Sequence, residues 1–217
     1  MGEVVAAPRD LPATMQTFHA QEDGSSVYNS PLETEKDLCP KQGDAVPGFA
    51  GTCGLCSSAN VLRLAGVDVG EKEVVEYAKA NGLCEQGHWD PGSNGGTSAQ
   101  GRQKILEHFG INSSVVPLAV DDNYEPTMAN ADIISDAVCS GKGVIISVHA
   151  HSLWYNDPHP INDLHAITVV SVKKVGDQVA GFYVNDTGVG GTQYYPATKL
   201  VGALSGNPIN VTNQIIR

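Results

Sequence analysis

The chain has 217 residues, of which 41% are hydrophobic and 17% charged, so it can form one medium-sized domain with a sizeable core. Its 13 Lys and Arg residues against 24 Asp and Glu residues give a net charge of −11, which repels phosphate backbones and anionic lipid surfaces. We therefore expect neither a nucleic-acid partner nor a membrane partner.

The segment 1–37 differs in composition from the rest of the chain. It contains three prolines and the polar stretch 21–26, and it shows no sustained hydrophobic periodicity. It also lacks the basic and apolar regions of a signal peptide. We interpret it as an extended or flexible N-terminal arm, either an ordinary N-terminus or the end of a linker from a longer parent protein. Residues 38–217 are expected to form the folded domain.

The first predicted helix comes after a loop rich in Gly and Pro and begins at Cys53. Leu55, Ala59 and Leu62 recur at helical spacing, and Gly66 ends the pattern. The threonine that precedes the helix is a plausible N-cap residue.

Three more helices are predicted after this one. The apolar stripe of 71–80 is closed by an Asn-Gly pair, and a loop over 83–94 comes next. A third helix begins after the segment 95–98 and stops at Gly110, and a short fourth helix covers 131–138.

The second half of the chain is predicted to form strands. The apolar run 143–148 is one strand, and two more join through a tight turn at 175–177. The expected strands are 143–148, 165–173, 178–186, 193–195 and 209–216. Helices followed by an antiparallel sheet predict an α+β fold, with a cleft between a helical lobe and a β lobe.

The five cysteines are an odd number, so at least one thiol lies outside any intramolecular disulfide. This favours a reducing compartment and a thiol retained for chemistry. Cys53 is the strongest candidate, because free N–H groups and the positive dipole end at a helix start favour thiolate over thiol. The same N–H groups can stabilise an oxyanion.

The other cysteines have plainer interpretations. Cys84 and Cys139 are expected to be small buried hydrophobes, and Cys39 could pair in a disulfide. A zinc site formed by Cys53, Cys56 and Cys84 with His88 is an alternative, although it lacks the second closely spaced cysteine pair of a typical zinc site.

A base and its orienting group are predicted from the strand pairing. The midpoint of positions 165 and 186 is 175.5, which lies within the predicted turn between the two strands. His165 and Asp186 should therefore lie at the same end of one hairpin, and a register shift of a residue or two would leave them within reach.

These residues resemble the sequence blocks of papain-like cysteine peptidases, and in particular the double-glycine leader peptidases of bacteriocin exporters. The resemblance is carried by Thr52-Cys53-Gly54-Leu55-Cys56 with Gly66 placed 13 residues after Cys53, by Gly96-Thr97-Ser98, by 164–170, and by Val184-Asn185-Asp186. The blocks occur in the order found in that family and cover about residues 47 to 190.

The resemblance implies a papain-like fold in which Cys53 is the nucleophile, His165 the base and Asp186 the group that orients the imidazole ring. It also implies cleavage of a protein substrate after a Gly-Gly pair, without a cofactor and without a metal. The family places an oxyanion-stabilising Gln six residues before the nucleophile, where this chain has Pro47. Gln42, eleven residues before Cys53, is the alternative donor, or backbone N–H groups act alone.

The choice of nucleophile and the residues of the substrate cleft stay open. Cys56 would be the nucleophile if the Cys-Gly-x-Cys pattern were matched instead, although the glycine spacing favours Cys53. Gly96, Thr97, Trp154 and His151 are candidates for the substrate cleft. The remaining histidines of the polar loop before His165, His149 and His159, are expected to be solvated for the most part.

The blocks of this sequence resemble only the peptidase part of the family, and no transporter domains accompany them. We therefore expect a stand-alone enzyme. Stand-alone versions resemble toxins that bacteria deliver into competitors. This predicts a monomeric effector that is secreted without a signal peptide, acts in the cytoplasm of a target cell and has a cognate immunity protein. A glutamine deamidase or transglutaminase with the same triad is one alternative, and an inactive peptide-binding module is another.

Overall fold

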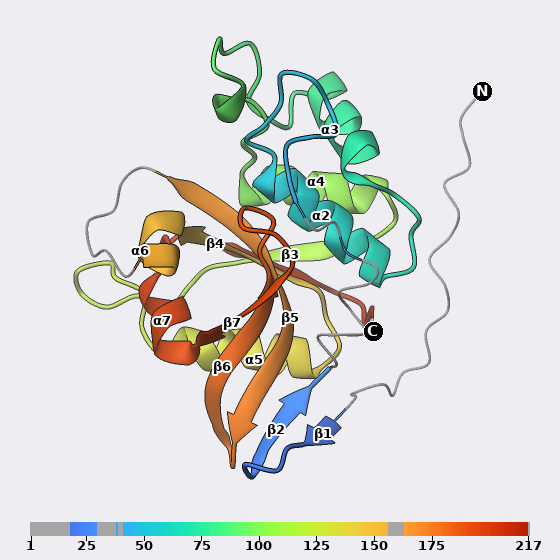
Figure 1. The fold of residues 1–217 in the computed structure, drawn as a ribbon. Helices are drawn as coiled ribbons and strands as arrows, with labels where there is room; N and C mark the ends of the chain where they lie inside the picture. The colour runs from blue at the N-terminus through green and yellow to red at the C-terminus, as the bar shows by residue number, and fades with distance from the viewer. Residues whose placement is uncertain (1–17, 30–37, 39–40, 156–162, 217) are drawn as a thin grey trace.

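The computed structural model describes residues 18–29, 38, 41–155 and 163–216 (Figure 1). Its helices are α2 (Cys53–Leu64), α3 (Glu71–Ala80), α4 (Ala99–His108), α5 (Ala129–Cys139), α6 (Ala150–Tyr155) and α7 (Ala197–Gly202), with a short 3₁₀ turn at Pro91–Ser93. Its strands are β1 (Phe18–Ala20), β2 (Ser25–Tyr28), β3 (Ser113–Val116), β4 (Val144–His149), β5 (Leu164–Val175), β6 (Gln178–Asn185), β7 (Thr192–Pro196) and β8 (Ile209–Thr212). The fold is α+β, as the sequence predicts.

The strands form one antiparallel sheet that is organised around β5. Strand β6 pairs along one edge of β5, while β4 pairs with its first half and β2 with its second half along the other edge. Beyond β4 the order continues through β8 to β3, and β7 lies outside β6. This places β5, which carries His165, in the centre of the sheet.

The hairpin of β5 and β6 contains an irregularity on each strand. Val170 is the extra residue on β5 and Ala180 is the extra residue on β6. The two shifts have opposite sense and cancel, because Val175 pairs with Gln178 at the turn and Thr168 pairs with Asn185 near the open end. The register observed at the turn is therefore restored at the end where the candidate residues lie, two positions from the direct pairing of His165 with Asp186 that the sequence predicts.

Helices cover both faces of the sheet (Figure 1). Helices α2, α3 and α4 enclose one core with inward residues of the sheet such as Ile145 and Ala166, whereas α5, α6 and α7 enclose another with their neighbours Ile146 and Ile167. Successive strand residues point to opposite faces, so each central strand contributes to both cores. The helical lobe predicted from the sequence thus corresponds to α2–α4.

The strong helix patterns end close to where the sequence predicts. Helix α3 covers the predicted 71–80, and α4 is capped by Ser98, whose hydroxyl accepts a hydrogen bond from the backbone N–H of Gly101 at 3.1 Å. The last strand is shorter than predicted. It ends at Thr212 instead of continuing to residue 216, because the Thr212 hydroxyl donates to the carbonyl of Gln214 and the chain bends there.

Several short elements escape the sequence patterns. The polar loop predicted before His165 contains α6, whose first-turn N–H of His151 donates to the Asp163 carboxylate at 2.8 Å. Strand β3 pairs with β8, about a hundred positions later in the chain, and α7 is only six residues long. Strands β1 and β2 lie within the segment 1–37 predicted as an arm, and β2 is paired to the sheet through β5.

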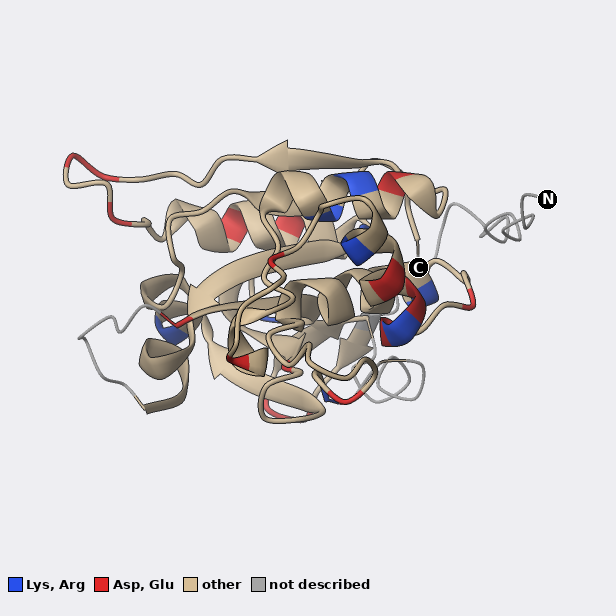
Figure 2. Ribbon diagram, turned by 90° about the horizontal axis from the view of Figure 1, so that it is seen from above, with Lys and Arg blue, Asp and Glu red and all other residues tan. Residues whose placement is uncertain are grey.

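Charged side chains are spread over the molecule. Figure 2 shows Lys and Arg residues on several separate elements, with Asp and Glu residues among them on the helices and at loops. Within the described residues, every helix is too short or too polar to cross a membrane.

Candidate active site

Cys53 is the first residue of α2. The preceding Thr52 is at the N-cap position, but its hydroxyl donates to the buried carboxylate of Glu71 and makes no capping bond to the helix. The first-turn N–H groups of α2 are therefore not capped by Thr52. They remain oriented toward the nucleophile end of the helix, where they favour a negative charge.

His165 lies near the start of β5 and contacts Asp186 just after the end of β6. The Nε2 atom of His165 is 2.8 Å from Oδ1 of Asp186, and both side chains are buried. The strand register places Asn185 opposite Thr168, so the pair is offset diagonally by two positions, within the tolerance that the turn arithmetic allows. With Nε2 engaged by Asp186, Nδ1 is the ring atom left for Cys53.

Asp186 is held by more donors than His165 alone. Its Oδ2 atom accepts from Trp154 Nε1 at 2.8 Å and from the Tyr195 hydroxyl at 3.3 Å, and its Oδ1 atom accepts from the Gly188 N–H at 3.1 Å. The Trp154 ring also packs against the His165 ring, with centroids 5.4 Å apart. A Cβ atom at Gly188 would lie 2.8 Å from Trp154, so this tight arrangement requires glycine there.

The pKa values of the three groups shift toward a charged pair. Burial raises the pKa of the Cys53 thiol, but the hydrogen bond and charge of His165, the Ala166 N–H and the charge of Arg102 outweigh it and lower the pKa below its usual value. Burial lowers the pKa of His165, whereas hydrogen bonds and charges of Asp186 and Cys53 raise it, to about 9 overall. Burial raises the pKa of Asp186, and its hydrogen bonds reverse that and keep it ionised. All three shifts favour a thiolate–imidazolium pair beside a carboxylate.

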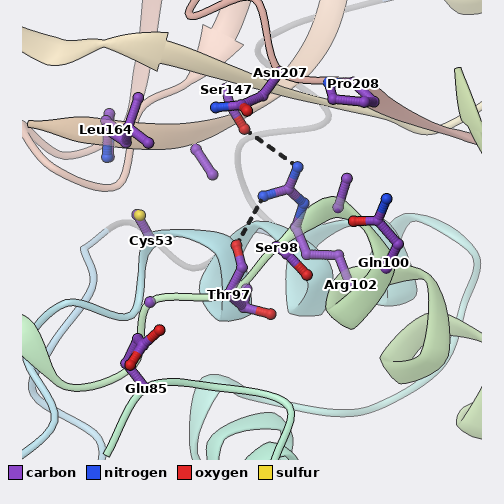
Figure 3. Close-up of a pocket in the computed structure, with 14 residues that line it drawn as sticks. Cys53, Glu85, Thr97, Ser98, Gln100, Arg102, Ser147, Leu164, Asn207 and Pro208 are labelled. Atoms are coloured by element: carbon purple, nitrogen blue, oxygen red, sulfur yellow. Dashed lines mark hydrogen bonds between the residues drawn. The ribbon is translucent and has the colours of Figure 1, made fainter. Parts of the chain in front are cut away.

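Cys53 and His165 open onto a cavity of about 360 Å³. Gly96 and Thr97, both predicted from the sequence as cleft residues, lie in its wall (Figure 3). The other lining residues are Glu85, Ser98, Ala99, Gln100, Arg102, Ser147, Leu164, Ala166, Asn207 and Pro208. The cavity thus lies between the helical lobe and the sheet, where the sequence predicts a cleft.

The geometry favours Cys53 over Cys56 as the nucleophile. Cys53 lines the cavity and hydrogen bonds to His165, whereas Cys56 is fully buried within the fold one helical turn later. Cys84 and Cys139 are half-buried free thiols whose pKa values are raised by burial. Cys39 lies outside the described residues.

Gln42 lies beside the loop that comes after Asp186. Its backbone N–H donates to the Thr187 carbonyl at 3.0 Å, and its side-chain carbonyl accepts from the Thr187 hydroxyl at 2.9 Å. Its side-chain amide nitrogen is 3.4 Å from the carbonyl of Ala50, three residues before Cys53. The longer loop thus brings Gln42 near both parts of the site, and its role as oxyanion donor stays a prediction.

Two candidates for the substrate cleft lie elsewhere. Among the described residues that line the cavity, neither Trp154 nor His151 is present. Trp154 instead supports Asp186 and His165, and the His151 ring packs near Tyr155 within α6, with centroids 5.0 Å apart. His159 lies outside the described residues.

The described residues contain no group of three or more His, Cys, Asp or Glu side chains arranged to hold a metal ion. The alternative of a zinc site at Cys53 and Cys56 with Cys84 and His88 therefore has no geometric support within that part of the chain. Cys53 instead hydrogen bonds to His165.

Sequence reasoning missed Arg102, Tyr195 and the contact between Trp154 and Asp186. Arg102 belongs to no recognisable motif in α4, and its partners Ser147 and Asn210 lie 45 and 108 positions away in the chain. Tyr195 reads as an ordinary strand residue. Only the folded sheet brings these side chains to the site, so no short motif could have identified them.

Neither the models of known protein families nor the curated proteins give a match to this chain. Among solved structures, a Bacillus anthracis protein described as a C39-like peptidase superposes with a TM-score of 0.56 at 14% identity, covering 82% of this chain and 95% of that one. The chain has a papain-like fold. At this level of identity the likeness describes the fold alone.

Two further solved structures match more distantly. One is a double glycine motif protease from an AMS/PCAT transporter in complex with the leader peptide, with a TM-score of 0.47, 13% identity and coverage of 82% of this chain and 97% of that one. The other is the Pseudomonas avirulence protein AvrPphB, with a TM-score of 0.32, 11% identity and the same coverage. The fold assignment rests on the first structure and on the site geometry.

Proposed function

We propose that this chain is a cysteine peptidase that hydrolyses a peptide bond of a protein substrate. The observation that carries the proposal is the alignment of Cys53, His165 and Asp186 beside a cavity large enough for a substrate side chain. His165 comes from β5, Asp186 from the residue after β6 and Cys53 from the start of α2, and their pKa shifts favour the ionised pair.

The reaction is a consequence of this arrangement. The Cys53 thiolate attacks the carbonyl carbon of the scissile bond, and first-turn N–H groups of α2 stabilise the resulting oxyanion, either alone or with Gln42 as a side-chain donor. The His165 imidazolium gives its proton to the departing amine as the C–N bond breaks and a thioester forms. Neutral His165 then takes a proton from water, which attacks the thioester and releases the acid and the thiolate.

Cleavage of denatured protein mixtures tests the activity directly. Purified protein should release new N-termini that mass spectrometry detects, whereas Cys53→Ala should release none and Cys56→Ala should still release them. Deamidated glutamines in uncut peptides would replace the peptidase proposal by an amidase. An unmodified mixture, together with no labelling of Cys53 by thiol-reactive peptide probes, would indicate a binding module.

The sequence resemblance extends this proposal to a preference for a bond after Gly-Gly. Peptides that carry Gly-Gly or Ala-Ala at a single position test it, because a narrow cleft admits the first pair and excludes the second. Equal cleavage of both peptides would contradict the proposed preference for a bond after Gly-Gly.

The same resemblance supports a role as an interbacterial effector. We propose secretion without a signal peptide, action in the cytoplasm of a target cell and neutralisation by an immunity protein. Expression in bacterial cytoplasm should arrest growth, and expression of Cys53→Ala at the same level should not. Normal growth with active wild-type enzyme would contradict the effector role while leaving the peptidase activity intact.

A further inference from the structure

Arg102 is a buried cation in the wall of the catalytic cavity. It projects from α4 and is 2% exposed. Its Nε atom donates to Asn210 Oδ1 at 2.8 Å, Nη2 donates to Ser147 Oγ at 3.2 Å, and Nη1 donates to the Thr97 carbonyl at 3.3 Å. Figure 3 shows the guanidinium group between Thr97 and Ser147, inside the cavity that Cys53 borders.

All of these partners are neutral. Within the described part of the chain, no carboxylate lies within ion-pair distance of Arg102. A guanidinium group has five N–H donors, and three donate in the bonds above, so two are left for a ligand. A buried charge is ordinarily paired, because its removal from water costs free energy that neutral partners offset only in part.

The guanidinium group lies next to the nucleophile. A Cβ atom built on Gly54 would be 3.6 Å from Nη1 of Arg102, so the cation packs against the first turn of α2. Glu85 also lines the cavity, but this residue is exposed to solvent, where water screens its charge. The depth of the cavity therefore holds the Arg102 cation beside the Cys53–His165 pair, within a chain whose net charge is −11.

We infer that Arg102 binds a carboxylate of the substrate, so that the enzyme selects an acidic side chain close to the scissile bond. The inference rests on the proposed peptidase function and names the class of substrate. A planar guanidinium fork matches a carboxylate, and a charge-assisted hydrogen bond in a buried site is stronger than a neutral one. A Gly-Gly pair has no side chain to enter this cavity, so the acidic residue would be a neighbour of that pair.

The hydrogen bonds of Arg102 also join α4 to β4 and β8. The experiment must therefore distinguish a purely structural role of Arg102 from binding of a carboxylate. Alkylation of Cys53 by iodoacetate and by iodoacetamide separates them, because the two reagents differ mainly in a carboxylate. The ratio of their rates at pH 7 cancels any change in thiolate content. Peptide mapping isolates Cys53 from the other thiols, and thermal unfolding verifies that each variant is folded.

Wild-type protein should favour iodoacetate, and Arg102→Gln should lower the rate ratio by about tenfold or more. Arg63→Gln removes an equal charge from the last turn of α2, outside the cavity, and should leave the ratio unchanged. An unchanged ratio in Arg102→Gln would overturn the inference. The absolute rate with iodoacetamide at acidic pH reports the thiolate itself, so a slow rate would refute the proposed function without affecting the ratio.

A second measurement needs no variant. Thiol-reactive peptide ketones that contain Glu or Gln at successive positions can be compared on the wild-type protein. At one position Glu should accelerate labelling of Cys53 by about tenfold over Gln. Equal labelling by both members of every pair would overturn the inference even if Arg102→Gln failed to fold.

Discussion

The nucleophile and its base are positioned by two different kinds of structure. Cys53 is placed by a local signal, the start of α2, although its neighbours His165 and Arg102 come from distant parts of the chain. His165 and Asp186 are placed by the register of a long hairpin whose two irregularities cancel. The helix side therefore depends on local chain geometry, whereas the sheet side depends on contacts made across the sheet.

Besides the contact between Cys53 and His165, two buried hydrogen bonds join the helix side to the sheet side. The buried Ser57 hydroxyl of α2 donates to the Ala166 carbonyl of β5 at 3.1 Å, and the Thr168 hydroxyl donates to the Ser57 carbonyl at 3.3 Å. These bonds hold the nucleophile helix against the residue next to His165. The comparison suggests that changes on the helix side act on the chemistry directly, while changes on the sheet side act through the charge of His165.

The largest effect is expected on the helix side. Cys53→Ala should remove all measurable peptide cleavage, because no other described thiol both borders the cavity and contacts His165. Cys56→Ala is the matched control and should keep most of the turnover. Loss of cleavage in Cys56→Ala, with Cys53→Ala active, would show that the glycine spacing was matched in the wrong register.

Gln42→Ala tests whether the Gln42 side chain stabilises the oxyanion together with the N–H groups at the start of α2. Loss of an oxyanion donor should reduce kcat by roughly 100- to 1,000-fold with little change in KM. Single-turnover kinetics on a cleaved peptide measure this. A turnover within about threefold of wild type would leave stabilisation of the oxyanion to backbone N–H groups alone.

Trp154→Phe breaks a support on the sheet side. It keeps an aromatic ring near His165 but removes the N–H that donates to Asp186 at 2.8 Å. We expect kcat/KM to fall by about tenfold, because a hydrogen bond to a buried charge is lost. Trp89→Phe alters the other, 89% exposed tryptophan and is the control. Equal kcat/KM for the two variants would mean that Trp154 does not position Asp186.

Ser57→Ala weakens the junction between the sides. The lost buried hydrogen bond should lower Tm by about 2–4 °C, as expected for a change of about 1 kcal/mol in a chain of this size. Ser114→Ala, at an exposed hydroxyl, should leave Tm nearly unchanged. Calorimetry on both variants gives the comparison, and equal Tm values would argue against a stabilising junction.

The sequence predicts the parts of the fold that are marked locally. Glycines at 66 and 110 punctuate long helical patterns, and the tight turn at 175–177 fixes the hairpin that joins His165 to Asp186. Helix α6 was missed because its cap, Asp163, comes after the helix in the chain and reaches it only by folding. Arg102 was missed for the same reason, since its polar partners come from β4 and β8.

The pH dependence of kcat/KM in Asp186→Asn tests the central claim, that His165 is held as an imidazolium beside the Cys53 thiolate. The pKa of His165 is raised to about 9, so on the alkaline side the active ion pair is lost as the pH rises through that value, when the imidazolium gives up its proton. Removal of the Asp186 charge lowers the pKa of His165, so the alkaline limb of the kcat/KM profile should move to lower pH. Cys53 is unchanged in this variant. An alkaline limb that stays in place in Asp186→Asn would contradict the account.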